Sequence, residues 1–426
     1  MDSKKLKYSE QFKEIREFLG DHDHLSRFEI LNDYPAYQSR YEKSWLDKLK
    51  ELSEEELYQV DTFGNPEVLK DHPMGSWLKR IKELTALDFE KLDNPKELPD
   101  WAFNKVKFKK RYEILKIGEW ITHLKKKEGF SHLVDIGGGV GHLARVLSHY
   151  FGIETISLDA NKTFQDLGKK RMNKYPRPEG AKELSFINMF FGADLKDEKD
   201  NQILEKVFSK EAISLGLHTC GPLAIGHMKT NLKFQTKGLL NFGCCYNKLD
   251  PLLDVNISEF AKKNPLAFNQ FALTLATRGH CVMDLEEFRL KRTVKKYRYG
   301  LHLFLLEHEQ TGDFLSVGEA HVKLYKGPFS DYLRSKYKEI GLTCSYDEEY
   351  INHFLEREDI KETLEEMFLC NVIRWQIGRV VEFYLLIDRA LYLQEHDQEV
   401  ELKQFFDEVV SPRNIGLFSL RKSEPS

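Results

Sequence analysis

The sequence predicts an α/β protein built on a parallel sheet, and three observations on one short stretch support this prediction. Residues 133–136 (LVDI) form an apolar run of the kind that becomes a buried parallel strand. A glycine-rich turn follows at 137–141, and apolar residues then recur at helical spacing up to residue 147. A second strand-like run, 154–158, ends at Asp159. A strand–turn–helix–strand unit of this type is the first half of a nucleotide-binding sheet.

The spacing of the glycines indicates which nucleotide is bound. They stand at 137, 139 and 141, whereas a dinucleotide fingerprint read from Gly137 needs a glycine at position 142, where the chain has His142. Glycine lets a ligand approach bare backbone, and the next helix presents unpaired N–H groups. An acid at the end of the second strand can accept hydrogen bonds from ribose hydroxyls. With Asp135 before the turn and Asp159 after it, we expect S-adenosylmethionine (SAM), which has a ribose and a charged tail but no pyrophosphate.

The remaining strand-like runs extend the sheet. They lie at 184–188, 212–217 and 238–243, and a closing antiparallel hairpin is expected at 400–406 and 414–420. The prediction is a Rossmann-like, seven-stranded sheet of the class I SAM-dependent methyltransferase type. Asn188 or Asp194, after the third strand, would read the adenine edge. The expected cofactor contacts are Asp135, Gly137, Gly139, Gly141, His142, Asp159, Asn188 and His218.

Proline breaks and helical periodicity predict three parts. Residues 1–100 are expected to form an N-terminal helical domain, because Asn-Pro and His-Pro pairs divide them into short helices. Residues 101–250 and 396–426 would form the methyltransferase domain. Residues 251–395 would be a mainly helical insertion before the last two strands, placed as a substrate lid.

Composition limits the partners and the compartment. Of the 426 residues, 31% are charged, and 64 basic against 68 acidic residues exclude a uniformly basic nucleic-acid coat but not a local patch. Six cysteines, two of them adjacent, form no spaced disulfide framework. The N-terminal stretch has no apolar signal core and no run reaches the length of a membrane span. We therefore expect a cytoplasmic protein without a membrane partner.

Two cysteine-bearing corners follow strands four and five. The chain reads His218-Thr219-Cys220-Gly221 after the fourth strand and Cys244-Cys245-Tyr246 after the fifth. Carboxyl ends of parallel strands share one edge of the sheet, so both corners should face the methyl group. The predicted catalytic residues are His218 as a base, Cys220, Cys245, and Tyr246, which would stack on a planar acceptor.

Four interpretations of the cysteines stay open. They could shape the pocket wall, or one of them could be a nucleophile that adds to a pyrimidine ring. They could bind zinc together with His218, although adjacent strand residues such as Cys244 and Cys245 point to opposite faces. They could also be core residues without a role. The interpretation adopted for the site includes no metal.

Two basic stretches have a functional and a structural interpretation. The run at 291–299 (KRTVKKYRY) interleaves cations with tyrosines, as RNA contacts require, but the interpretation preferred here is a solvated helix face. The segment at 106–114 precedes the first strand, where it could close over the cofactor or simply start a helix.

These motifs together resemble a known family. The chain is similar to the methyltransferase-domain family of methyltransferase-like protein 25 and of the so-called ribosomal RNA adenine dimethylase domain-containing protein. The matching motifs are KKRYEI (109–114), DIGGGVGHL (135–143), GLHTCGPLA (216–224), GCCYNKL (243–249) and FFDEVVSPRNIGL (405–417). A similar HxCG…CC arrangement occurs in the tRNA acceptor-stem 2′-O-methyltransferases. The resemblance implies a SAM-dependent methyltransferase and leaves its substrate undefined.

The chain departs from the family pattern at two places. Tyr112 stands where the family usually has a histidine, which puts an acid/base role there in doubt. Adenine dimethylation would also need an Asn-Pro-Pro-aromatic corner after strand four, where this chain has the corner that begins at His218. The first candidate acceptor is RNA, either tRNA or rRNA. A protein or small-molecule acceptor, or a SAM-binding scaffold without catalysis, are the alternatives, and protein partners are not indicated.

Overall fold

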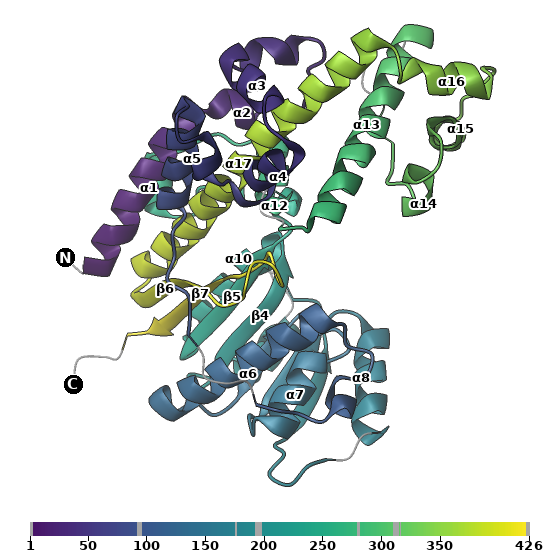
Figure 1. Ribbon diagram of the computed structural model, residues 1–426. Coiled ribbons are helices and arrows are strands. Elements are labelled where there is room, and N and C mark those ends of the chain that lie inside the picture. The colour runs from purple at the N-terminus through teal and green to yellow at the C-terminus, as the bar shows by residue number, and fades with distance from the viewer. Residues whose placement is uncertain are drawn as a thin grey trace. The chain divides into compact units, whose positions relative to one another are not determined.

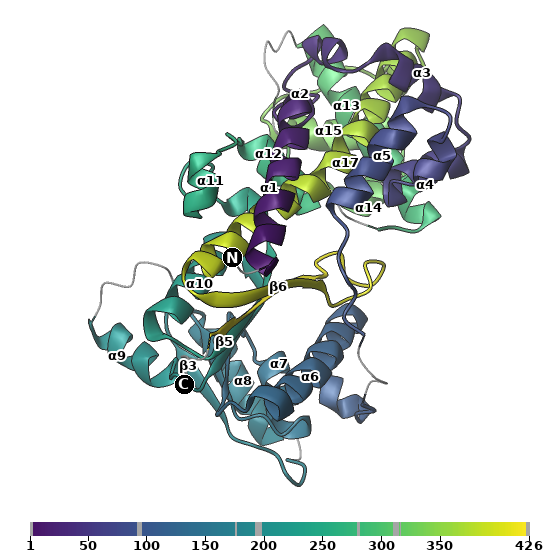
Figure 2. The ribbon, with the colours of Figure 1, turned by 90° about the vertical axis from the view of Figure 1, so that its left-hand side faces the viewer.

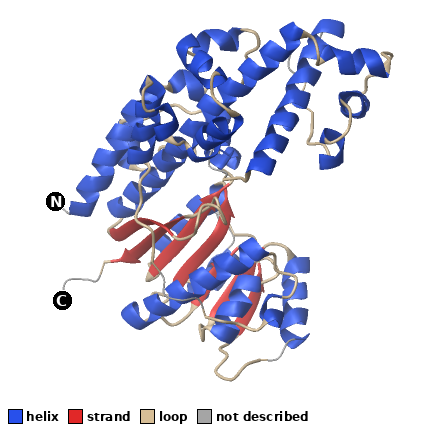
Figure 3. Ribbon diagram, in the orientation of Figure 1, coloured by secondary structure: helices blue, strands red, loops and turns tan. Residues whose placement is uncertain are grey.

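The computed structural model describes residues 3–91, 96–174, 177–191, 198–278, 282–309, 315 and 317–422. Contacts divide the chain into two compact units (Figure 1). Residues 1–20, 84–277 and 380–426 form the first, here called the sheet unit, and residues 21–83 and 278–379 form the second, the helical unit. In the described residues, every named strand belongs to the sheet unit (Figure 3).

The sheet has seven strands in the order β3-β2-β1-β4-β5-β7-β6. Its first five strands are parallel, and β7 runs antiparallel to both β5 and β6. This confirms the predicted class I fold and its closing hairpin. The strands are β1 (Leu133–Ile136), β2 (Thr155–Asp159), β3 (Leu184–Asn188), β4 (Ile213–Cys220), β5 (Gly238–Cys244), β6 (Gln398–Gln404) and β7 (Ile415–Arg421).

Helices cover both faces of the sheet because successive strand residues point to opposite sides. Leu133 packs into one core with α6 and α7, whereas Val134 packs into another with α9. Figure 2 shows α6 and α7 on one side of the strands and α9 and α10 on the other. These helices are α6 (Phe108–Glu128), α7 (His142–Tyr150), α8 (Lys162–Lys174), α9 (Glu198–Val207) and α10 (Pro222–Phe234).

The sheet unit also contains helices that the sequence places elsewhere. Phe12 of α1 (Ser3–Asp21) contacts the rings of Phe260 and Tyr384, with ring centroids 5.7 and 4.6 Å away. Asp388 accepts hydrogen bonds from Ile257 N and Ser258 N and so holds the segment before α11. The expected boundaries at 100, 251 and 395 therefore differ from the observed ones, because aromatic and polar contacts distant in sequence join these segments to the sheet. The helices concerned are α1, α11 (Glu259–Lys263), α12 (Gln270–Arg278) and the end of α17 (Glu358–Glu395).

The helical unit combines two distant parts of the sequence. Lys291 pairs with Asp61, and Gln376 donates to the carbonyl of Val60, so α13 and α17 pack with α4. Its helices are α2 (Asp23–Ser26), α3 (Lys43–Lys50), α4 (Glu54–Phe63), α5 (Pro73–Leu84), α13 (Leu285–His308), α14 (Val322–Tyr325), α15 (Phe329–Glu339), α16 (Glu348–Phe354) and the first part of α17.

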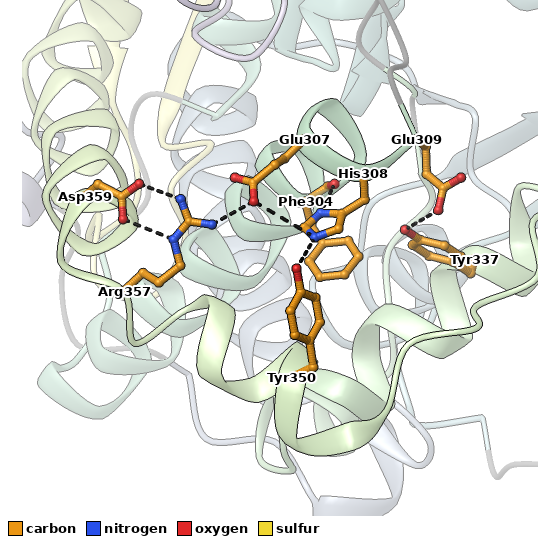
Figure 4. Close-up of polar contacts among 8 residues, drawn as sticks. All are labelled: Phe304, Glu307, His308, Glu309, Tyr337, Tyr350, Arg357 and Asp359. Carbon is orange, nitrogen blue, oxygen red and sulfur yellow. Dashed lines mark hydrogen bonds and ion pairs between the residues drawn. The ribbon is translucent and has the colours of Figure 1, made fainter.

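A polar network ties the end of α13 to its neighbours (Figure 4). The His308 ring stacks on Phe304 with centroids 4.0 Å apart, and its Nε2 lies 2.7 Å from the Tyr350 hydroxyl of α16. Arg357 bridges Glu307 and Asp359, which links α13 to the start of α17. Within the described ranges, no helix has the length and apolarity needed to cross a bilayer.

Candidate active site

The glycine turn after β1 adopts a backbone that side chains rarely tolerate. Gly137, Gly139 and Gly141 have φ angles of 68°, 57° and 72°. A Cβ atom on Gly139 would meet no atom within 4 Å, so the turn is open on this side. A Cβ on Gly141 would lie 2.6 Å from the Phe186 ring, which makes glycine necessary there for packing as well. The turn therefore presents bare backbone to a ligand at Gly139.

Asp159 faces this turn, as the sequence predicts. Its Oδ2 accepts a hydrogen bond of 2.8 Å from Gly139 N, and its Oδ1 accepts one of 2.7 Å from Asn161 N. Asn188, its partner on β3, donates from Nδ2 to the Asp159 carbonyl. Asp159 and Asn188 thus lie side by side at the ends of β2 and β3. Asp194 lies outside the described residues.

Asp135 is buried beneath the turn. Burial raises its pKa to about 7, the nearby Lys110 ammonium lowers it, and Asp159 raises it further. Its Oδ2 atom is shielded from solvent and has no hydrogen-bond partner among the described residues. A buried carboxylate oxygen without a partner favours a cation at this position. SAM carries two positive groups, an ammonium and a sulfonium, so the residues at the turn fit this cofactor.

His142 is placed differently from the expected cofactor contact. Its Nε2 lies 2.8 Å from Arg171 Nη1 of α8, and burial together with Arg171 and Arg145 lowers its pKa to about 4. A neutral His142 accepts the Arg171 hydrogen bond and joins α7 to α8. Its place at the start of α7 is as predicted, but this ring nitrogen is already engaged.

Glu113 is a site residue that the sequence analysis did not single out. It lies on α6 with a fully buried side chain and accepts hydrogen bonds from His218 Nε2 at 3.0 Å and Ser411 Oγ at 2.8 Å. Burial raises the pKa of Glu113, but the contacts with His218, Lys110 and Ser411 outweigh it and leave the pKa below its usual value. A signal for Glu113 exists in the sequence, since it shares the buried helical stripe of Ile117 and Ile121.

His218 occupies a bulge near the end of β4. The register between β4 and β5 shifts between Leu217 and Thr219, and His218 itself has φ of 63°. This irregularity directs the imidazole to Glu113 on α6. Because Nε2 of His218 is engaged by Glu113, Nδ1 is the ring nitrogen that could accept a proton from a substrate.

The two cysteine corners meet, as predicted. Cys220 and Cys244 are paired residues of β4 and β5, and the Cys220 sulfur lies 3.1 Å from that of Cys244 and 3.2 Å from that of Cys245. The expectation that Cys244 and Cys245 point to opposite faces is wrong. Cys245 has φ of 50°, so the alternation of the strand ends at this residue and both thiols reach Cys220.

The three thiols have different acidities. Hydrogen bonding from Cys244 lowers the pKa of Cys220 to about 5 despite partial burial, and the Lys248 and His218 charges act in the same direction. The pKa values of Cys244 and Cys245 are raised, through hydrogen bonding to Cys220 and through burial respectively. Cys220 is therefore the thiol that ionises first.

Tyr246 does not occupy the expected position at the acceptor. Its side chain is buried, its hydroxyl donates to Glu382 Oε1 at 3.2 Å, and Arg389 lies 5.5 Å from the ring centroid. Because the ring lies in the core, the prediction that it stacks on an acceptor is wrong. Tyr112 likewise has a structural contact, since its hydroxyl accepts a hydrogen bond from Asp407 N.

The basic run at 291–299 lies on α13 of the helical unit, and several of its cations have acidic partners. Lys291 pairs with Asp61, Arg292 with Glu365 and Lys296 with Glu356. Tyr297 donates to the Gly327 carbonyl, and Tyr299 is buried. These contacts serve packing within the unit and favour the structural interpretation of the run.

The strand order, the open glycine turn and the facing Asp159 define a class I methyltransferase fold, whose cofactor is SAM. Residues 109–251 match the family model described as "Methyltransferase domain".

Two curated proteins are similar to part of the chain. The chain is 25% identical over 287 residues to "Probable methyltransferase-like protein 25" of Mus musculus. This alignment covers 63% of this chain and 46% of that protein. It is 23% identical over 278 residues to the Homo sapiens protein of the same name, with 62% and 45% covered. The match thus spans somewhat less than half of each relative.

A solved structure, the plantazolicin methyltransferase BamL in complex with a triazolic desmethylPZN analog and SAH, shares 13% identity. The alignment covers 89% of this chain and 99% of that one, with a TM-score of 0.27. A likeness of this strength does not inform the site.

Proposed function

We propose that this chain transfers a methyl group from SAM to an oxygen or nitrogen atom that carries a proton, with RNA as the first candidate acceptor. The observation that supports this proposal is the pairing of the buried Glu113 with the partly exposed His218 at the carboxyl end of β4, the edge of the sheet to which the glycine turn also belongs. Open α/β sheets bind ligands at this edge.

The cofactor would be held by residues from three strand ends. Asp159 would exchange its hydrogen bond from Gly139 for the ribose hydroxyls, and Asn188 lies beside it for the adenine edge. Asp135 would face the amino-acid tail, whose positive charge would favour the ionised form of this buried carboxyl group. When bound, SAM supplies a methyl group made electrophilic by its sulfonium.

The Glu113–His218 pair would remove the acceptor proton. Glu113 is ionised at neutral pH because its pKa is lowered, and it fixes the His218 ring through Nε2. The acceptor O–H or N–H proton would pass to Nδ1 as the methyl bond forms, and the Glu113 charge would stabilise the imidazolium. A methyl transfer to an atom without a proton would need no such pair.

RNA is preferred because a hydroxyl acceptor suits the base and because the resemblance noted above includes tRNA 2′-O-methyltransferases. Half-exposed cations also lie on α6 beside the site, namely Lys109 and Arg111. The second candidate, a protein or small molecule, is favoured by the net charge of −4. A scaffold that binds SAM without catalysis is the third. Free thiols at Cys220 and Cys244 favour a reducing compartment, so the location we propose is the cytoplasm.

Tritiated SAM separates these candidates. The purified chain is incubated with a lysate from cells that lack it, and the label is counted in RNA, protein and small-molecule fractions. Label in RNA supports the first choice, and label in either other fraction supports the second. SAM binding without label in any fraction would establish the scaffold. A weak affinity for bulk RNA that does not change with salt would also argue against the first choice.

A further inference from the structure

The sulfur atoms of Cys220, Cys244 and Cys245 form a compact triangle. All three lie within 4.8 Å of one another, and two of the distances are 3.1 and 3.2 Å. They come from two neighbouring strand ends, and the left-handed backbone of Cys245 is what brings the third thiol to the other two. Backbone strain of this kind costs free energy and is found preferentially at functional sites.

The spacing suits a thiophilic metal ion. Zinc binds thiolate sulfur at about 2.3 Å, so tetrahedral ligands lie about 3.8 Å apart, and small side-chain rotations open the present triangle to that size. A disulfide joins sulfur atoms at about 2.05 Å and would use two of the thiols, leaving the convergence of the third without a reason.

The surroundings can support the charge of bound thiolates. The Lys248 ammonium is a positive charge close to the Cys220 sulfur. The Lys110 ammonium lies close enough to Cys244 to interact electrostatically with its thiolate form. Partial exposure of Cys220 and Cys245 leaves an approach for an ion, whereas Cys244 is buried.

We propose that Cys220, Cys244 and Cys245 bind a single thiophilic metal ion, with Zn²⁺ as the first candidate. Three protein ligands leave one position of a tetrahedral ion open, as in catalytic rather than structural zinc sites. His218 does not complete the set, because among the described residues the group of converging ligand atoms consists of the three cysteines. This site goes beyond methyl transfer, and its test measures the metal rather than the reaction.

The test titrates Co²⁺, and then Zn²⁺ in competition, into the reduced, metal-free full-length chain. Binding to thiolates gives a sulfur-to-cobalt charge-transfer absorption that saturates at one ion per chain, with release of protons. Cys220→Ser and Cys245→Ser should weaken binding by roughly 100-fold or more, since even changes outside the ligand set commonly cost 10- to 100-fold. The control is Cys344→Ser, a free cysteine of the helical unit, which should bind as the unaltered chain does.

Thermal unfolding and SAH calorimetry on the same samples verify folding and test the cofactor site separately. The proposal is overturned if the unaltered chain gives no charge-transfer absorption. It is also overturned if the Cys220 and Cys245 variants bind as the Cys344 variant does. Mass spectrometry of peptides from freshly purified protein gives a further check. A pair of peptides linked through Cys220 and Cys244, with a mass two hydrogens below the sum of the two free peptides, would show a disulfide there and overturn the proposed metal site.

Discussion

Glu113 holds a negative charge where solvent does not reach it, and three neighbours make this possible. His218 and Ser411 donate hydrogen bonds to it, and the Lys110 ammonium lies 3.9 Å away. A buried carboxylate is retained where such partners offset the loss of hydration. The pair of Glu113 with His218 is therefore the feature of the site best suited to proton transfer.

Substitution of either member should reduce methyl transfer. His218→Ala removes the base and should lower kcat by about 100- to 10,000-fold, the usual contribution of general base catalysis. Glu113→Gln keeps the shape of the side chain but removes the charge that stabilises the imidazolium, so this substitution should also lower kcat. Label transfer under single-turnover conditions measures both.

The control for these variants is His123→Ala, which alters an exposed histidine on the same helix. SAM affinity should stay within about threefold of the unaltered value in all three proteins. A His218→Ala protein that binds SAM and retains full kcat would contradict the assignment of the base.

Asp135 makes stability depend on pH. Burial raises its folded-state pKa to about 7, above the usual value of 3.8 for this carboxyl group. A carboxyl group with a raised folded pKa contributes its full stability below the unfolded pKa and loses it as pH rises through the folded pKa. Because of Asp135, the free energy of unfolding should fall by up to about 1.4 kcal/mol per pH unit as the pH rises from the unfolded pKa to the folded pKa of this carboxyl group.

Urea unfolding from about pH 4 to about pH 8 measures this dependence. Asp135→Asn should lack that component of the slope, whereas Asp166→Asn, an exposed change on α8, should keep it. Equal slopes in the unaltered chain and the Asp135 variant would show that Asp135 does not hold a proton in the folded state.

Single residues show what sequence reasoning can reach. Asp135, Asp159 and the glycines were predictable because their roles follow from local order along one strand–turn–helix unit. Glu113 and Ser411 lie 298 positions apart and meet only through the fold. The bulge at His218 and the left-handed Cys245 depend on backbone angles that composition and periodicity do not report.

Among the elements, α13 shows that a basic run can be a packing surface. Lys291 is 14% exposed and its partner Asp61 is 1% exposed, whereas Lys296 and Glu356 are 42% and 57% exposed. Removal of one partner of a buried pair leaves a charge without compensation, but an exposed pair contributes little. Substitutions of Lys291 and Lys296, which lie on the same helix, therefore compare a buried ion pair with an exposed one.

Lys291→Met should destabilise the helical unit by about 3–5 kcal/mol, and Lys296→Met by about 1 kcal/mol or less. Hydrogen exchange in α4 and α13 gives the local free energy of opening. If Lys291→Met left the unit stable but lowered RNA affinity, the run would be an RNA contact after all.

Helix α1 belongs to the sheet unit through Phe12, a fully buried ring. Phe12→Ala removes its contacts with Phe260 and Tyr384 and should cost about 3–5 kcal/mol. Hydrogen exchange in β6, whose Leu402 N donates to Tyr8 of α1, reports the effect. The control is Glu17→Ala, an exposed change on the same helix. Equal hydrogen-exchange protection of β6 in the two variants would show that α1 does not stabilise the sheet.

Strands were predicted more successfully than boundaries between units. Each strand of the sheet coincides with an apolar or alternating run, because burial imposes a pattern on the strand itself. The unit boundaries depend instead on which distant helices pack together. The single helix α17 contributes to both units, and no break in its sequence marks the change at residues 379 and 380.

For the whole molecule, the sheet unit brings together the cofactor turn, the proton-transfer pair and the cysteine triangle at the carboxyl ends of its parallel strands. The helical unit has its own core and its own polar network (Figure 4). Methyl transfer, RNA recognition and metal binding can therefore be tested separately on the full chain. Methyl transfer, to RNA or to any other acceptor, presupposes that the glycine turn and Asp159 bind SAM.

Isothermal titration calorimetry with SAM and with its demethylated product SAH tests this premise most directly. We predict binding of both, weakened by about 10- to 150-fold in Asp159→Asn, because hydrogen bonds to a charged group contribute about 1.5–3 kcal/mol. Asp166→Asn, which carries the same change on the neighbouring helix, should bind normally. No heat with either compound, together with tight binding of a pyridine dinucleotide, would contradict the account.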